Sequence, residues 1–587
     1  RVWCIFEIYT ALTYTAKMLD FATFSDGKVH IITQGLTKSE QSDDAILPGA
    51  GWENKTLREQ SFPLQVLEAG LSLKVQDASA SMPEDKQHIL NTIANIPLDQ
   101  EPPTEHCVYD SVNQTVRGLL AGVAWPQALR RGKVADLNLP DRLRADEQCA
   151  DLSMSFSAAD FNDSDCVMDD EQLRLLAEGL PPKLSGSLVL DFSYCDRIGS
   201  KGICALSRSI SKYSSLTMLS LNFSNASVDK EEAMQDLGSS IRQLAGLKSL
   251  TLQFNASDRI TDKTMHELTR GIGSLSQLEE LCLIVAFCMG LGDRFLEGLS
   301  SSVQKLRGSL ASLRVDCTHC RDITNQGIIA ISGGLRGLSS LMTVHLSFHG
   351  CHKITDAGAS ALGSMLGQLD NLKDLDLGLE LCTGFSRNGI EHIARHLRGR
   401  KSIKGIVFSF TAGGVRRCVG STADLAQDLS PDWWTEQVHD DASTGIECGH
   451  GHRLSGRRVL LLTDFNFWDE EYNRPRMSLE AQGAQVCVAS KQRPGTMLFG
   501  QHGTRCRVDF NIDDMYRAGD YMTFDAVFIP GGAAPQRFRN TQAAHKIIEW
   551  MVQRKRVVAA ICHGVKALGA AGVLSGAKCT SYSGIKL

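Results

Sequence analysis

An apolar position recurs at a nearly constant interval through the middle of this chain. Between about Ser187 and Phe410 the successive intervals are 31, 31, 31, 32, 31, 31 and 31 residues, and another apolar residue follows two positions later each time. The recurring residues are Leu188, Leu219, Leu250, Leu281, Leu313, Val344, Leu375 and Ile406. Alternating apolar residues predict a short strand. Because one such unit cannot bury its apolar face alone, the interval predicts a stack of repeats that share one core.

Each expected strand is followed by a turn and then by a helical stretch, such as the one over residues 354–366. A strand and a helix in each unit are typical of leucine-rich repeats, which we assign to residues 150–410 as a solenoid. The strand face should be concave and open to a protein partner. Its expected exposed positions are Asn222, Gln253, Asp316, His345, Asp376 and Ser409.

Several of the 18 cysteines follow the same repeat. Each of these lies seven residues after the first apolar residue of its unit: Cys195, Cys288, Cys320, Cys351 and Cys382. Leucine-rich repeats place Asn or Cys there to meet backbone groups in the turn, which predicts a ladder of buried thiols. Cys317 and Cys320 also have the spacing of half a zinc site, but no second pair follows at zinc-finger distance, so we expect no metal. Buried free thiols favour a reducing compartment, the cytoplasm.

Length and charge limit what the rest of the chain can be. With 587 residues it should contain roughly three or four domains. A net charge of -6 gives no reason to expect a nucleic acid or a membrane surface as a partner. No apolar run approaches the ~20 residues of a membrane span. No cofactor is expected either.

Residues 1–135 are expected to form an α/β fragment with a strand over 28–33 and helices near 84–96 and 110–120. Trp3, Cys4 and Glu7 resemble the late-helix motif of plant-type TIR domains, in which the glutamate serves NAD cleavage. The alternative, which we favour, is a plain amphipathic helix that packs its apolar side chains into a core.

Residues 411–456 are expected to be a linker, because they show little periodicity and contain Gly413-Gly414 and Ser430-Pro431. Cys448, His450 and His452 could bind a metal within this segment. A flexible polar linker is the favoured interpretation, since a glycine-rich run holds no fixed ligand geometry.

Near the C-terminus, residues 557–561 are five small or β-branched apolar residues in a row, which predict a strand buried on both faces. A small-residue helix is expected directly afterwards, and Cys562 falls at the turn between the two. A thiol there faces the amides of the first helical turn, a setting that lowers a cysteine pKa from ~8.5 towards ~3.5–7.5. Cys562 is therefore a candidate nucleophile, with a buried structural cysteine as the alternative.

Two other stretches could serve the same site. The apolar run 524–530 ends in Gly531 and Gly532, whose amides could approach a carbonyl oxygen without a side chain in the way and form an oxyanion site. The strand expected from Arg457 to Asp464 is followed by a loop, residues 467–471, that is rich in carboxylates. Ligand sites of open parallel sheets lie at this carboxyl edge.

From Arg457 to Leu587 the chain resembles the PfpI-like branch of the DJ-1/PfpI superfamily, which shares a flavodoxin-like α/β sandwich with class I glutamine amidotransferases. The match includes Ala489-Ser490, residues 500–503, Val508-Asp509, residues 524–532, residues 560–564, residues 571–574 and residues 580–582. The resemblance implies that Cys562 is the nucleophile, that Glu471 contacts it, and that His563 is the histidine that follows the nucleophile. Glu471 would lie on a loop ahead of a helix beginning near Pro475, and Tyr582 is a candidate for the substrate pocket.

The resemblance has two departures. Ser583 stands where the family usually has proline, and the chain ends at Leu587, before the family's last strand and helix. Members of this family often complete their sites at subunit contacts, which implies a homo-oligomer formed through the C-terminal domain.

Two functions follow from these features. In the first, the C-terminal domain is a cysteine-dependent enzyme of the deglycase, glyoxalase or cysteine peptidase type, and the repeats tether it to a protein partner. A small dicarbonyl or a glycated molecule suits the turn best as substrate. In the second, the chain is an interaction protein and the C-terminal domain is a redox sensor or is inert. We favour the first.

Overall fold

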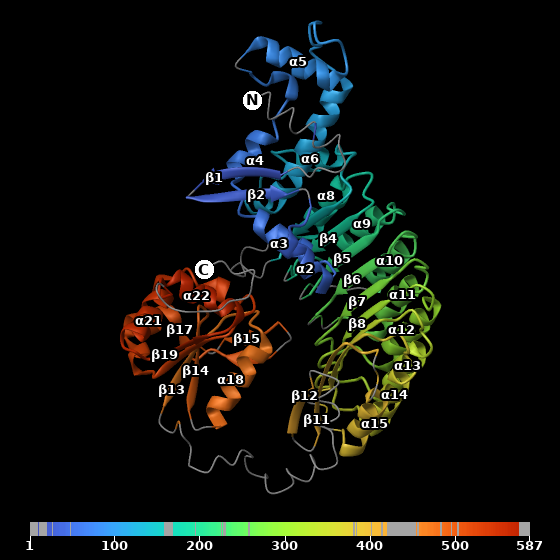
Figure 1. Ribbon diagram of the computed structural model, residues 1–587, viewed down its shortest axis with the longest axis vertical. Coiled ribbons are helices and arrows are strands. Elements are labelled where there is room, and N and C mark those ends of the chain that lie inside the picture. Colours follow the sequence, from blue (N-terminus) through green and yellow to red (C-terminus); the bar gives the residue numbers. More distant parts are fainter. Residues whose placement is uncertain are drawn as a thin grey trace. The chain divides into compact units, whose positions relative to one another are not determined.

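The computed structural model resolves two compact units, residues 1–429 and 430–587, which are described separately below (Figure 1). It describes residue 10 and residues 20–574, except the segments 158–167, 227–230, 413–414, 420–453, 455–456, 482–483 and 502–503 and residues 26, 34, 47, 81, 194, 225, 256, 258, 380, 381, 383, 399, 401 and 495. Glu7 and the residues of the proposed TIR-like motif, Cys448, His450, His452 and Tyr582 lie outside the described residues.

The first unit is built on one sheet whose parallel strands follow the 31-residue interval. These strands are β4 (Ser187–Asp191), β5 (Met218–Asn222), β6 (Ser249–Gln253), β7 (Glu280–Ile284), β8 (Ser312–Asp316), β9 (Thr343–Ser347), β10 (Asp374–Leu379) and β11 (Gly405–Ala412). Leu188 pairs with Leu219, Leu219 with Leu250, and so on to Leu375 with Ile406. The predicted repeat strands and their register are confirmed.

Two further strands were not predicted. β3 (Leu152–Ser155) precedes the repeats and pairs in parallel with β4, Leu152 opposite Leu188. β12 (Val415–Val419) pairs antiparallel with β11, so the part of the chain assigned to a linker begins with strand. The interval could not reveal either strand, because β3 is offset by 36 residues from β4 and β12 runs in the opposite direction.

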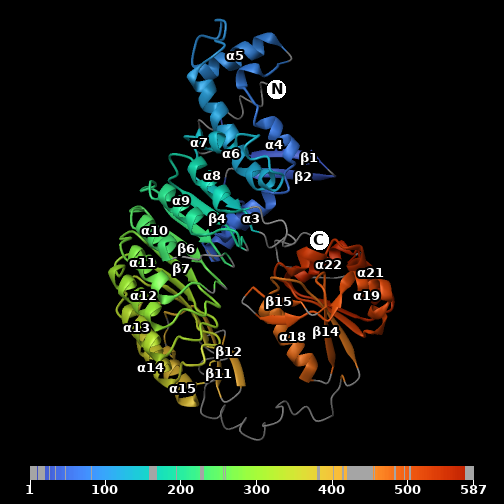
Figure 2. The ribbon, with the colours of Figure 1, turned by 180° about the vertical axis from the view of Figure 1, so that it is seen from behind.

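A helix precedes each repeat strand, and these helices cover one face of the sheet (Figure 2). The helices are α8 (Asp170–Gly179), α9 (Ser200–Ile210), α10 (Glu231–Ile241), α11 (Asp262–Ile272), α12 (Asp293–Lys305), α13 (Asn325–Leu335), α14 (Asp356–Leu366) and α15 (Arg387–Leu397). Polar side chains at Asp169, Thr261, Thr324 and Ser386 accept a backbone N–H of the first helical turn and fix where the helices begin. The recurring apolar residues are at most 3% exposed and form the core.

The thiols at the fixed position in the repeats form the predicted ladder. Each is fully buried and donates to a backbone carbonyl of the preceding unit, at 3.2 Å for Cys320 to Val285 and 3.0 Å for Cys382 to Phe348. The same contact recurs for Cys195, Cys288 and Cys351. In the described part of the chain all cysteines are free, and no group of three or more His, Cys, Asp or Glu residues could hold a metal ion.

The predicted open positions on the strand face are only partly exposed. Asn222, Gln253, Asp316, His345 and Asp376 are half-buried. Ser409 is 6% exposed, so the prediction is wrong there. β12 pairs alongside β11 and brings Cys418 opposite Ser409, a neighbour that the repeat pattern does not reveal.

The N-terminal part of the first unit packs against the start of this sheet. A hairpin of β1 (Asp20–Ser25) and β2 (Lys28–Thr33) precedes α2 (Lys38–Ile46), α3 (Ala50–Glu59), α4 (Leu64–Gly70), η1 (Val75–Asp77), α5 (Pro83–Ala94), α6 (Cys107–Arg130) and α7 (Leu139–Arg144). The expected strand and both expected helices are therefore present, the second as part of the longer α6. Helices α3 and α6 lie against β3.

The second unit is an open parallel sheet in the order β17-β14-β13-β18-β19. Its strands are β13 (Arg458–Leu462), β14 (Gln485–Ser490), β17 (Phe510–Asn511), β18 (Ala526–Ile529) and β19 (Val557–Ala560). If the two-residue β17 is left out and the other four strands are renumbered in chain order, β14-β13-β18-β19 becomes 2-1-3-4. This is the strand order of a flavodoxin-like fold. A small separate hairpin joins β15 (Met497–Phe499) and β16 (Arg505–Arg507). In the described residues no helix is long and apolar enough to cross a membrane.

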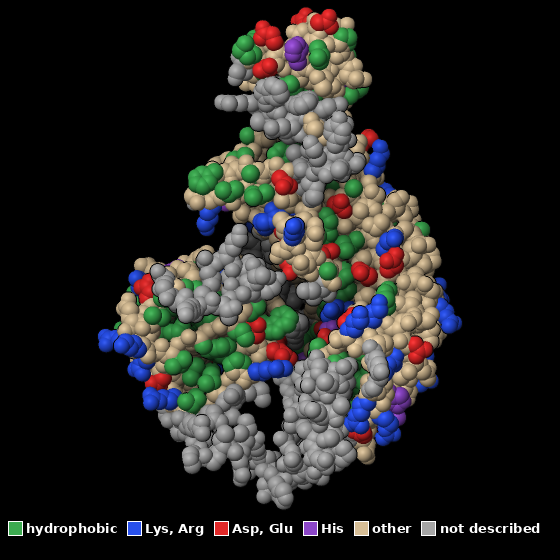
Figure 3. All heavy atoms as spheres, viewed as in Figure 1, with side chains coloured by type: hydrophobic (Ala, Val, Ile, Leu, Met, Phe, Trp, Pro, Cys, Tyr) green, Lys and Arg blue, Asp and Glu red, His purple; other side chains and the backbone are tan. Residues whose placement is uncertain are grey.

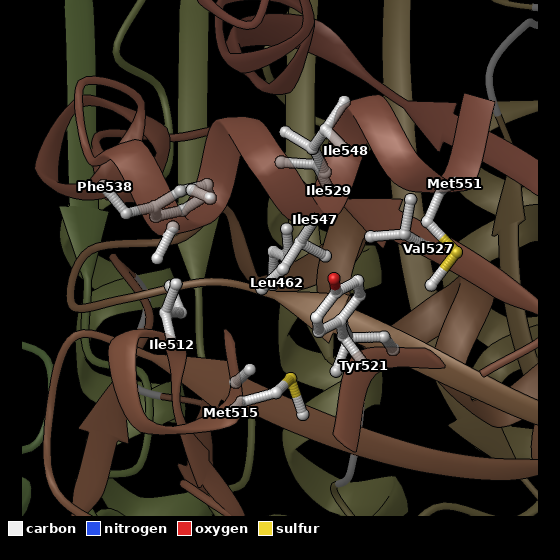
Figure 4. Packing of buried hydrophobic residues seen from close by; sticks show 14 of the residues in the cluster. Leu462, Ile512, Met515, Tyr521, Val527, Ile529, Phe538, Ile547, Ile548 and Met551 are labelled. Carbon is white, nitrogen blue, oxygen red and sulfur yellow. The ribbon is translucent and has the colours of Figure 1, made fainter. Parts of the chain in front are cut away.

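Alternate residues of β13 face opposite sides of this sheet, as a strand period of two requires. Leu460 and Leu462 join a core with α19 (Ile512–Ala518), η2 (Asp520–Thr523), α21 (Gln542–Gln553) and α22 (Val565–Ala570), part of which Figure 4 shows. Val459 and Leu461 join a second core with residues of α18 (Asp469–Ala481), the β15–β16 hairpin and α20 (Ala534–Phe538).

β19 differs from the prediction that it is buried on both faces. Val557 is 65% exposed and Ile561 is 44% exposed. In the described part of the sheet β19 is an edge strand with β18 as its one neighbour, so its outer side chains have less to pack against.

Candidate active site at Cys562

The site lies where the strand order of the second unit reverses. β13 and β18 are neighbours in the sheet, but the chain leaves β13 towards β14 on one side and leaves β18 towards β19 on the other. In open parallel sheets of this class, the loops after two such strands diverge, and ligands bind at that carboxyl edge. Glu471 follows β13, Gly531 follows β18 and Cys562 follows β19, so the topology brings together the three predicted segments.

Cys562 occupies a sharp turn with a left-handed backbone. Its φ is 51°, a conformation that costs a non-glycine residue roughly 1–2 kcal/mol. The turn continues as η3 (Cys562–Gly564) and α22. A Cβ on Gly564 would lie 2.3 Å from the carbonyl oxygen of Ile529, so only glycine lets the turn pack this closely on β18. Strained backbone of this kind clusters at functional sites because neighbouring structure must enforce it.

Glu471 reaches the thiol from α18. The structure places it in the first turn of this helix, which begins at Asp469, so the predicted helix start near Pro475 is wrong. Its Oε2 accepts the Gly531 N–H at 2.8 Å, and the carboxyl group also hydrogen-bonds to the Cys562 thiol. A Cβ on Gly531 would lie 2.5 Å from Glu471 Oε2 and 2.7 Å from the Cys562 Cβ.

The Gly531 amide therefore does not have the partner that the oxyanion prediction gave it. Its N–H is donated to Glu471 and does not point freely at a substrate oxygen. The backbone N–H groups of His563 and Gly532 instead hydrogen-bond to the Cys562 sulfur. Gly532 has φ 76°, and a Cβ there would lie 2.5 Å from both Asn466 O and Trp468 N. The Gly532 amide thus meets the Cys562 sulfur, whereas a carbonyl oxygen was its predicted partner, and the close approach of the Asn466 and Trp468 backbone requires glycine there.

The thiol does not have the lowered pKa that its position in the sequence predicts. Burial and then the nearby Glu471 charge raise the pKa of Cys562 above its ordinary value, although the His563 and Gly532 amides oppose the shift. Burial also raises the pKa of Glu471. Both groups thus hold a proton more tightly than free side chains do, and negative charge on one disfavours negative charge on the other. The prediction considered the helix terminus alone and left out this carboxyl group.

Two basic side chains, His563 and Lys566, also lie near the Cys562 thiol. His563 Nδ1 lies 3.5 Å from the Cys562 sulfur, within reach for proton exchange. Lys566 is close enough to interact electrostatically with Cys562, while burial and Arg539 lower the pKa of this lysine. His563 was predicted, and Lys566 was not. Its position one helical turn after Cys562 is the only sequence signal for it.

The other carboxylates that follow β13 are used structurally. Asp464 is fully buried and accepts from the Ser490 hydroxyl at 2.8 Å and from the Lys491 amide at 3.2 Å. Asp469 accepts the Thr504 amide. Glu470 forms a 2.8 Å ion pair with Arg474. Among these described carboxylates, Glu471 is the one that contacts the thiol.

Comparison with known proteins gives a family match over the same part of the chain. Residues 457–587 match the DJ-1/PfpI family. Deglycase PH1704 of Pyrococcus horikoshii is 42% identical over 129 residues, which are 22% of this chain and 74% of that protein. Deglycase PfpI of Pyrococcus furiosus is 37% identical over 129 residues, with the same two coverages of 22% and 74%. The solved structure of a ThiJ/PfpI domain protein from Brachyspira murdochii covers 22% of this chain and 71% of its own, at 23% identity and a TM-score of 0.20.

Proposed function

The chain belongs to the DJ-1/PfpI family through residues 457–587, and on this premise we propose that Cys562 attacks the carbonyl carbon of a small dicarbonyl or glycated substrate. The observation that carries the proposal is the strained turn at Cys562 with Glu471 against its thiol. A structural cysteine would need neither the left-handed backbone nor a half-buried carboxyl partner. The deglycase names of two relatives support this substrate class, while a third relative, from Bacillus subtilis, is named a putative cysteine protease.

The first chemical step needs a proton to move as the sulfur attacks. The sulfur forms a bond to the carbonyl carbon, and the π electron pair of that carbonyl moves onto its oxygen. The thiol proton passes to Glu471, and the carboxyl group or His563 returns a proton to the oxygen, which gives a neutral hemithioacetal. The amides of Gly532 and His563 can stabilise negative charge on sulfur or oxygen during the step. For a dicarbonyl, a proton then moves from the hemithioacetal carbon to the neighbouring carbonyl carbon, which oxidises the first carbon and reduces the second and gives a 2-hydroxy thioester. Water hydrolyses this thioester to the hydroxy acid and restores the Cys562 thiol.

Replacing Glu471 with Gln should separate its electrostatic role from its role in proton transfer. The Glu471 charge raises the thiol pKa, so the variant should lower that pKa and move the alkylation profile of Cys562 to lower pH. Methylglyoxal turnover should nevertheless fall by roughly 10²-fold or more, because the amide cannot carry the proton. The rate of iodoacetamide labelling at Cys562 between about pH 6 and about pH 9, followed by peptide mass spectrometry, measures the shift.

Glu470→Gln is the matched control, since Glu470 pairs with Arg474 rather than with the thiol. Its alkylation profile and turnover should both equal those of the unmodified protein. An alkylation profile that stays in place in Glu471→Gln would remove Glu471 from the site.

For the first unit we propose a leucine-rich-repeat solenoid that binds a protein partner and tethers the enzyme unit to it. The strand register and the cysteine ladder support the repeat class.

The second candidate function is an interaction protein with a redox-sensing Cys562. The half-buried thiol favours it, because peroxide could oxidise this thiol to sulfenic acid. Peroxide-dependent oxidation of Cys562 without any dicarbonyl turnover would support this candidate.

We also propose that the second unit forms a homo-oligomer and that the protein is cytoplasmic. Hydrophobic side chains gather on the surface of this unit in Figure 3, and Val557 on the edge strand is 65% exposed. Within the described residues the outer edge of β19 has no neighbouring strand, and such an edge with apolar neighbours favours association. The free cysteines of the described residues support a reducing compartment.

A further inference from the structure

Two histidines lie side by side on the repeat helix α15. His392 and His396 are four residues apart, a spacing that puts both side chains on one face of the helix. Their ring centroids are 4.7 Å apart, and the two ring planes are inclined to each other by 47°. Both side chains are half-buried, so a small solute can reach them. The chemistry proposed for Cys562 uses neither ring.

The backbone of the neighbouring helix α14 supports both rings. Figures 1 and 2 draw α14 beside α15. A Cβ on Gly363 would lie 3.0 Å from the His392 Cδ2, and a Cβ on Gly367 would lie 2.7 Å from the His396 Cδ2. The two glycines are also four residues apart, so one glycine lies beside each imidazole. This packing limits the orientations of the rings before a ligand arrives, which reduces the entropy cost of binding one.

A hydrogen bond determines which nitrogen of His396 is free. Its Nδ1 lies 2.9 Å from the backbone carbonyl oxygen of His392. Because a carbonyl oxygen only accepts, Nδ1 must carry the proton and Nε2 must carry the lone pair. Metal-binding histidines usually make this kind of hydrogen bond through the nitrogen that does not bind the metal. On His392, Nε2 lies 3.5 Å from the Ser364 hydroxyl, at the outer limit of a hydrogen bond.

The charged neighbours of the pair do not supply a further ligand. Glu391 forms a 2.9 Å ion pair with Arg398. Within the described residues, no group of three or more His, Cys, Asp or Glu residues is placed to hold a metal ion. Arg395 is exposed, so water and salt screen its repulsion of a bound cation. The protein therefore offers two imidazoles and leaves the other coordination positions to water.

We propose that His392 and His396 together bind one divalent transition-metal ion, with water in its remaining coordination positions. Imidazole is a preferred ligand of Cu²⁺, Ni²⁺ and Zn²⁺, whereas Mg²⁺ prefers oxygen. Histidines with this spacing bind zinc from one face of a helix in metalloproteases. Metal–nitrogen bonds of about 2.0–2.1 Å require two ring nitrogens no more than about 4 Å apart. Rings whose centroids are 4.7 Å apart can reach this separation by small rotations.

A shared ion should bind much more tightly than an ion on either ring alone. Once one imidazole holds the ion, the second binds it within the same molecule, which raises the affinity by roughly 10²-fold or more. Removal of one histidine should therefore cost roughly this factor. Among the imidazole-binding ions, Cu²⁺ should bind more tightly than Ni²⁺, and Ni²⁺ more tightly than Co²⁺.

Protection of the rings from diethyl pyrocarbonate tests the proposal in the full chain. The reagent modifies imidazole nitrogens, and tandem mass spectrometry of peptides locates the modification on each of the 16 histidines. At about pH 7.5, where histidine is mostly neutral, Ni²⁺ should slow labelling of His392 and His396 with one shared midpoint, and Mg²⁺ should not. His396→Ala should raise the Ni²⁺ concentration that half-protects His392 by roughly 10²-fold. His352→Ala, which removes an exposed histidine from the turn before α14, should leave that midpoint unchanged.

Labelling of both rings that Ni²⁺ does not change would overturn the proposal, and this result needs no variant. Equal midpoints for His392 in the unmodified chain and in His396→Ala would overturn it as well, because each ring would then bind its own ion. Neither result bears on methylglyoxal turnover by Cys562, so failure here is distinct from failure of the proposed enzyme function.

Discussion

Cys562→Ser should abolish methylglyoxal consumption, with a fall of about 10³-fold or more. A serine hydroxyl is far less nucleophilic than a thiol near neutral pH, and Glu471, even with its raised pKa, is a carboxylate and too weak a base to ionise a hydroxyl. The side chains have similar sizes, so the turn and its contacts with Glu471 should persist. Colorimetric or enzymatic measurement of the remaining dicarbonyl over time gives the rate directly.

Cys107→Ser is the control for this experiment. Cys107 is an exposed free thiol at the start of α6, so it can react nonspecifically with a dicarbonyl. Its loss should leave enzymatic turnover unchanged. If Cys562→Ser turned over methylglyoxal at the original rate, the interaction-protein function would become the better account of the chain.

Gly531→Ala should lower methylglyoxal turnover by about 10²-fold. The added Cβ would lie 2.5 Å from Glu471 Oε2 and 2.7 Å from the Cys562 Cβ, so one or both groups must move. A displacement of about 1 Å at a reacting group costs a factor of this size. Turnover is measured together with the thermal unfolding temperature, which separates a displaced site from an unfolded domain.

Gly333→Ala, in the repeat helix α13, is the matched control because a Cβ there meets nothing within 4 Å. Gly333→Ala should leave methylglyoxal turnover and the thermal unfolding temperature nearly unchanged. Full activity in Gly531→Ala would mean that Glu471 and Cys562 need not be held together as the structure shows.

The register of the repeats could be predicted from the sequence because one apolar position determines it. Once Leu188 and Leu219 are placed at the same position in successive units, their pairing follows from stacking. The same regularity placed Cys320 in the turn, where its thiol donates to Val285. Non-periodic contacts could not be obtained in this way: the Thr251 hydroxyl donates to the Pro48 carbonyl across 203 positions, and no pattern in the sequence reveals that bond.

The members of the candidate site could be predicted better than their roles. Cys562, His563, Glu471 and Gly532 meet at one edge of the sheet, as expected from the segments that carry them. The sequence could not show that the Gly531 amide is donated to Glu471, because that bond joins segments 60 positions apart. For the same reason it could not show that Glu471 raises the thiol pKa, an effect that opposes the local effect of the helix terminus.

Titration with iodoacetamide most directly tests the claim that Cys562 performs the chemistry. The unmodified protein is treated with increasing, limiting doses at about pH 8, where the raised pKa of the thiol still allows reaction. At each dose, methylglyoxal turnover is measured and the labelled cysteines are quantified by peptide mass spectrometry. We expect remaining activity to fall in direct proportion to the fraction of Cys562 that is labelled, whatever the labelling of Cys107. Full activity in protein whose Cys562 is completely alkylated would contradict the account.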